Sequence, residues 1–169
     1  MRIIKELIPY VVIVLVVVLF RTFIATPVIV SGSSMDPTLK NGDILVLNKL
    51  ATKYNRYDIV VIDSVINGKK ERIVKRIIAL PSENIEYKDH KLYINSKKMK
   101  DDFDYKTNDF SLEELEGVKK IPEGYYFVMG DNRGRSLDSR DSRVGLVKEE
   151  DIIGKPVIRI WPINKIGTI

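Results

Sequence analysis

The chain has 169 residues, 44% of them hydrophobic and 30% charged, which suits one domain with its own core better than a disordered protein. Its net charge of +5 is dispersed among acidic residues and gives no indication of nucleic-acid binding. The absence of cysteine and the single histidine, His90, exclude a thiol nucleophile, disulfides and the cysteine-based or multi-histidine metal sites, so we expect no metal or other cofactor.

The N-terminus carries a long apolar segment. Leu7 to Phe20 has no charge, and after Arg21 the apolar character continues to Val30. If Arg21 snorkels toward the lipid surface, about 18 to 20 residues can span a bilayer. A cleavable signal peptide is the alternative, but its apolar region is usually shorter and is followed by small residues. We therefore predict an uncleaved transmembrane helix within residues 1–25.

Charges before this segment predict its orientation. Arg2, Lys5 and the amino terminus precede it, and the positive-inside rule keeps such flanks in the cytoplasm. Residues 26–169 would then form one extracytoplasmic domain of a single-pass protein, with membrane lipid as a partner.

Strand signals dominate this second part of the chain. Runs dense in β-branched residues and separated by turn residues lie at Ile44–Asn48, Asp58–Asp63, Arg72–Leu80 and Tyr125–Gly130. These runs predict a mostly β domain with antiparallel sheets.

The strongest turn signal is Asn67-Gly68, because both central residues of a type I′ turn need positive φ. This turn folds the preceding strand back on the next one and places Lys75 opposite Val60, with Ile73 and Ile77 on the same face as the lysine. A lysine would then lie among aliphatic side chains.

A second hairpin is predicted over Asn84–Asn95, with a turn near Asp89 and His90. Further on, Ser111 and Glu114 have the spacing of a capping box at the start of a short helix. We interpret residues 84–122 as a surface insertion.

Two loops hold residues that could carry chemistry, Ser31–Asp43 and Gly130–Arg140, although both also read as ordinary turns. A serine hydroxyl needs a base, and with so little histidine the plausible base is a neutral lysine amine. Lowering a lysine pKa to 7 or 8 takes about 3 units, or about 4 kcal/mol, which apolar burial can supply. Lys75 has suitable neighbours; the alternative is a strand lysine that snorkels to solvent.

Four segments in this order resemble those of the type I signal peptidases: GSSMDPTL, GDILVLNK with RYDIVVI, RIVKRIIALPSE and GDNRGRSLDSRDSRVGLV. The chain is similar over essentially its whole length to the short form with one anchor that is typical of Gram-positive bacteria. The resemblance implies a Ser–Lys endopeptidase in the bacterial cell membrane that removes signal peptides from secretory preproteins.

The family's motifs also imply roles for individual residues. Ser34, before Met35, is the implied nucleophile, and Lys75 is the implied general base of a reaction through an acyl-enzyme. Three further features are implied to support the site: a hydrogen bond from Ser136 to the lysine amine and the ion pairs Asp131–Arg76 and Asp138–Arg140. The chain departs from the family at Gly32, where some members have a serine in the oxyanion hole, and in the turns at 56–58 and 79–83.

Bulky aliphatic residues near the implied catalytic pair are expected to leave shallow pockets for small side chains, such as Ala, at the −1 and −3 positions of a substrate. These residues are Val28, Val30, Met35, Leu39, Ile73 and Val74.

Three alternatives stay open at this point. A self-cleaving repressor of the DNA-damage response would share the Ser–Lys chemistry, but it would not need the anchor. A mitochondrial inner-membrane peptidase would share the motifs. An inactive, membrane-tethered binding module would bind signal peptides without hydrolysing them, but it would not need Ser34, Lys75 and Ser136 together.

Overall fold

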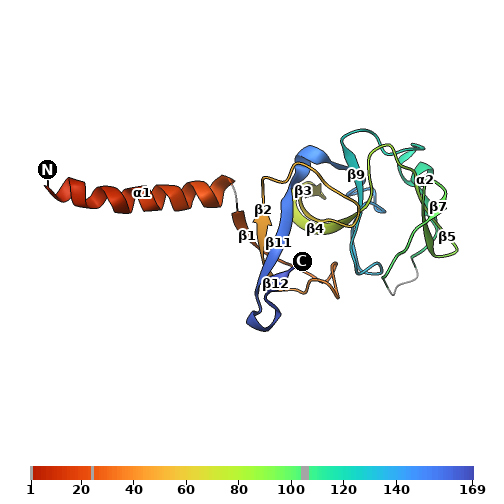
Figure 1. The fold of residues 1–169 in the computed structure, drawn as a ribbon. Coiled ribbons are helices and arrows are strands. Elements are labelled where there is room, and N and C mark those ends of the chain that lie inside the picture. Colours follow the sequence, from red (N-terminus) through yellow and green to blue (C-terminus); the bar gives the residue numbers. More distant parts are fainter. Residues whose placement is uncertain (1, 24, 104–106) are drawn as a thin grey trace.

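The structure is a computed structural model that describes residues 2–23, 25–103 and 107–169. Helix α1 (Arg2–Phe23) extends away from a domain built mainly of β-strands (Figure 1). Within the described residues, no helix combines the length and apolar character needed to cross a membrane. The predicted transmembrane helix is therefore not confirmed, whereas the predicted mostly β, antiparallel domain is.

The larger of two sheets has eight strands, all paired antiparallel, in the order β1-β2-β11-β3-β4-β9-β10, with β12 beside β11. Its strands are β1 (Ala25–Ile29), β2 (Ile44–Asn48), β3 (Ile59–Ile66), β4 (Lys69–Ala79), β9 (Tyr125–Met129), β10 (Val147–Lys148), β11 (Ile152–Trp161) and β12 (Gly167–Thr168). Two short 3-10 helices, η1 (Glu149–Asp151) and η2 (Ile163–Lys165), flank β11.

The β3–β4 hairpin follows the sequence prediction. Asn67 and Gly68 both have positive φ, 52° and 76°, as a type I′ turn requires. The resulting register pairs Val60 with Lys75. Strand β9 joins the other side of β4 only between Arg76 and Ala79, so among the described residues the stretch just before Arg76 has no strand on that side.

Residues 84–122 contain the second sheet. It has the order β7-β6-β5-β8, built from β5 (Ile85–Lys88), β6 (Lys91–Ile94), β7 (Lys97–Lys98) and β8 (Phe110–Ser111), followed by helix α2 (Leu112–Glu116). The hairpin turn at Asp89 and His90 and the capping box of Ser111 with Glu114 are both present.

Three clusters of buried side chains form the core. One lies between the second sheet and β9 and includes Ile85, Leu112, Ile121 and Phe127. The insertion therefore packs on the larger sheet through a hydrophobic core of its own, although its sequence looked largely polar. The other two clusters lie on the larger sheet, one with Val74 and the other with Val60, which is the cross-strand partner of Lys75.

Candidate active site

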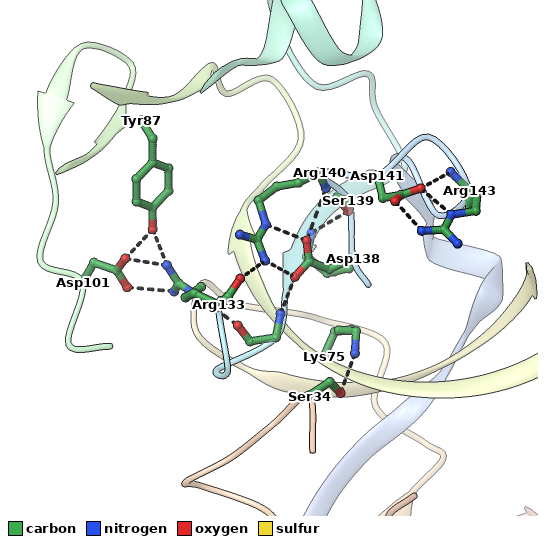
Figure 2. A network of polar contacts seen from close by, with 12 residues as sticks. Ser34, Lys75, Tyr87, Asp101, Arg133, Asp138, Ser139, Arg140, Asp141 and Arg143 are labelled. Atoms are coloured by element: carbon green, nitrogen blue, oxygen red, sulfur yellow. Dashed lines mark hydrogen bonds and ion pairs between the residues drawn. The ribbon is translucent and has the colours of Figure 1, made fainter. Parts of the chain in front are cut away.

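Ser34 and Lys75 meet although 41 residues separate them in the chain. Ser34 lies in the turn that follows β1, and Lys75 lies on β4 opposite Val60. Lys75 Nζ is 2.7 Å from Ser34 Oγ, and only 3% of the lysine is exposed (Figure 2). This distance allows direct proton transfer between the two side chains.

The protonation of Lys75 is set mainly by its burial. Desolvation lowers the pKa of its amine from 10.5 to about 8, against the opposing effect of the carboxylates of Asp138 and Asp131; the nearby Arg140 lowers it further. At pH 7 about one molecule in ten then holds the neutral amine, which can accept a proton from a serine hydroxyl.

The closing loop, residues 130–140, is hydrogen-bonded to the nucleophile turn, and two of its carboxylates form ion pairs with arginines. Asp131 accepts two hydrogen bonds from Arg76, at 2.8 and 2.7 Å. Asp138 has a fully buried side chain and accepts two from Arg140, both at 2.8 Å (Figure 2). Asp138 also accepts the Gly130 N–H at 2.9 Å, which fixes the start of the loop at the end of β9.

Gly130 marks the closest approach between this loop and the nucleophile turn. A Cβ at this position would collide with Ser136 Oγ and with the backbone carbonyl oxygen of Ser34. Asn132 joins the same two segments, because its backbone N–H donates to Ser34 O and its side-chain amide to Ser33 O, both at 3.0 Å. Neither Gly130 nor Asn132 was predicted as a site residue from the sequence, although both lie within the GDNR motif.

Ser136 is near this contact, but it does not make the expected bond. Its Oγ is buried and has no hydrogen-bond partner among the described residues, so the bond to the Lys75 amine is not formed in this structure. Its role in orienting the lysine stays a prediction.

Most of the expected substrate-pocket residues lie in one cluster. Val28, Val30, Met35, Leu39 and Val74 are buried and pack together between β1, the nucleophile turn and β4. Ile73 does not belong to this cluster. It is partly buried against another one, which contains Val60 and Ile77.

A cavity of about 510 Å³ adjoins the nucleophile turn. Three segments line it: residues 36–38 of the nucleophile turn, 102–103 of the insertion and 131–132 of the closing loop. The space next to Ser34 is therefore shaped partly by the insertion.

Comparisons with known proteins point to one family. The family model described as "Signal peptidase, peptidase S26" matches residues 3–161. Signal peptidase I of Bacillus caldolyticus is 41% identical, over 93% of this chain and 91% of its own length. Signal peptidase IB of Staphylococcus aureus is 36% identical, over 95% and 93%. The crystal structure of a signal peptidase I from Enterococcus faecalis V583 is 40% identical and covers 61% of this chain and 96% of its own, with a TM-score of 0.55. The chain therefore belongs to the signal peptidase family, peptidase S26.

Proposed function

We propose that this chain removes signal peptides from secretory preproteins with Ser34 as the nucleophile and Lys75 as the general base. The observation that carries the proposal is the 2.7 Å contact between Ser34 Oγ and a lysine amine that burial brings to a pKa of about 8. The amine can hold and release a proton near neutral pH, which histidine does in other serine peptidases.

The reaction has two halves. Ser34 Oγ attacks the scissile carbonyl carbon as its proton passes to the neutral Lys75 amine, and the tetrahedral intermediate then expels the amine of the mature protein, which takes that proton. In the second half, water attacks the resulting ester as one of its protons passes to Lys75. The new tetrahedral intermediate expels Ser34 Oγ, which takes that proton back, and the signal peptide leaves with a free carboxylate. Residue 32 is a glycine and has no side chain that could donate to the oxyanion, so backbone N–H groups of the nucleophile turn would stabilise it.

The substrate would bind as an extended strand. Among the described residues, no strand pairs with one side of β4 before Arg76, and such an edge can form backbone hydrogen bonds with a peptide. Val28, Val30, Met35, Leu39 and Val74 lie next to this edge and are too bulky to leave deep pockets. Ile73, which packs in the other cluster, would border the edge from the face of β4 that carries Lys75. Small side chains at −1 and −3 fit such a surface.

Membrane attachment through residues 1–25 belongs to the proposal. Helix α1 has 22 residues, about 33 Å at 1.5 Å per residue, which is close to the hydrocarbon thickness of a bilayer. Leu7, Ile8 and every residue from Tyr10 to Val18 are at least 50% exposed, and lipid would cover them. We propose a single pass in a bacterial cell membrane, with the N-terminus cytoplasmic and residues 26–169 outside as the peptidase domain.

A preprotein with Ala at −1 and −3 tests the proposal. Detergent-solubilised parent should release the mature domain, and Ser34→Ala and Lys75→Ala should not. Ser64→Ala is the matched control, because it removes a hydroxyl from β3 at its pairing with Glu71, away from Lys75, and should cleave like the parent. Binding of the preprotein without hydrolysis by the folded parent would instead support a binding module, and cleavage that survives Lys75→Ala would refute the assigned base.

A further inference from the structure

A buried ion pair links the insertion to the loop that closes the active site. Arg133 follows Asp131 and Asn132 in that loop, and its side chain is fully buried. Its Nη1 and Nη2 donate to the Asp101 carboxylate at 2.5 and 2.7 Å (Figure 2). The Tyr87 hydroxyl contacts both partners. Burial raises the pKa of this phenol, so the hydroxyl stays protonated and donates to Asp101.

Phe103 adds a second contact from the same segment of the insertion. Its ring centroid lies 4.6 Å from the guanidinium carbon of Arg133 and 5.5 Å from that of Arg76. Arg76 is the partner of Asp131. The insertion therefore contacts both arginines that hold the beginning of the closing loop.

Arg133 also connects these contacts with the segment that holds Ser34, through two hydrogen bonds that involve backbone carbonyls. Its Nε donates to Gly130 O at 3.2 Å, and its own carbonyl accepts a hydrogen bond from Arg140 at 2.9 Å. Gly130 is the residue whose missing Cβ lets the loop approach Ser34 O and Ser136. A chain of contacts thus runs from Asp101 through Arg133 and Gly130 to the nucleophile turn.

We infer that Asp101 is a positioning residue for the Ser–Lys reaction: by holding Arg133, it fixes the 130–140 loop against Ser34 and Lys75. The inference rests on the proposed function. Buried ion pairs are weak evidence for stability, because well-packed apolar residues often replace them at no cost. A pair that only stabilised the fold could therefore be replaced in that way without loss of activity.

The test compares the parent with two variants. One is Asp101→Asn, and the other is a double variant that combines Asp101→Leu with Arg133→Met. We expect kcat to fall in both, on the order of tenfold to a hundredfold, with KM nearly unchanged, because small misplacement of catalytic groups costs rate more than binding. The double variant should regain the parent's melting temperature but not its kcat. The acid limb of its pH profile should also shift, since Asp131 and Asp138 in this loop influence Lys75.

Asp141→Asn is the matched control. Asp141 and Arg143 form a bidentate pair with 2.8 and 2.7 Å contacts just after the same loop (Figure 2). Both side chains are exposed, and among the described residues neither is hydrogen-bonded to Gly130. This variant should keep the parent's kcat and pH profile. A double variant that is both as stable and as active as the parent would overturn the inference, as would kcat losses that follow the melting temperature across all variants.

Amide hydrogen exchange at Gly130 and Asn132 gives a readout that does not depend on cleavage. Exchange should accelerate in Asp101→Asn and in the double variant, and it should not change in Asp141→Asn. Unchanged exchange would overturn the inference even if the parent proved inactive. Failure of the parent to cleave, with accelerated exchange in the variants, would refute the proposed function and leave the positioning intact.

Discussion

Protonation of Lys75 should switch off cleavage as the pH falls. Only the neutral amine can accept the Ser34 proton, so kcat/KM should rise with pH through the lysine pKa and level off above it. Burial brings that pKa from 10.5 to about 8, which leaves about a tenth of the molecules competent at pH 7 and about a hundredth at pH 6. A lysine with a pKa of 10.5 would leave only about one molecule in 3000 with a neutral amine at pH 7, so burial raises the activity at that pH by about 300-fold.

The assay is kcat/KM on a preprotein with Ala at −1 and −3, from pH 6 to pH 9.5 at constant ionic strength. Below pH 8 the rate should fall tenfold for each pH unit. His90→Asn is the control, because this single histidine sits in a hairpin turn, where its Nδ1 is 2.8 Å from Thr107 O. An acid limb that disappears in His90→Asn would refute the reasoning, and so would a flat profile.

Three further predictions concern the groups around the pair. The pKa of Lys75 is lower in the folded than in the unfolded chain, so the charged amine destabilises the fold below pH 8 by about 3 kcal/mol. This penalty fades between pH 8 and 10.5. Lys75→Met should therefore resist urea denaturation better than the parent at pH 7 and equally well at pH 10.5. Gly130→Ala should abolish cleavage and lower the melting temperature, whereas Gly117→Asn, with φ of 70° and open space around it, should do neither. Asp138→Asn removes a charge that raises the lysine pKa, so the acid limb should move to lower pH, while denaturation should show a loss of about 3 kcal/mol from the broken pair with Arg140.

The position of Lys75 was predictable because the rules that set it are local. The Asn67-Gly68 turn fixes the register of the hairpin, and the two-residue period of a strand then places Lys75 opposite Val60. The meeting of Lys75 with Ser34 was not predictable from spacing, since it depends on how the nucleophile turn packs on β4. The resemblance to a family supplied that step.

The role of the insertion was missed for a physical reason. Leu112 and Ile121 are fully buried, but charged residues surround both in the sequence, so the stretch looks like a solvated surface. Asp101 precedes another aspartate and follows a lysine, which gives it no periodic or motif signal. Only the folded chain shows that Arg133 reaches it, because the pair joins residues 32 positions apart.

Because the closing loop must approach the nucleophile turn at Gly130, peptidase activity should appear only when the domain is completely folded. The nucleophile turn, β4 and the closing loop come from three distant parts of the chain, and loop-closure entropy opposes each meeting until the sheet between them has formed. A partly folded chain that already holds the β3–β4 hairpin still lacks a working centre. A newly made molecule would therefore be unable to cut neighbouring polypeptides until its last long-range contacts are in place.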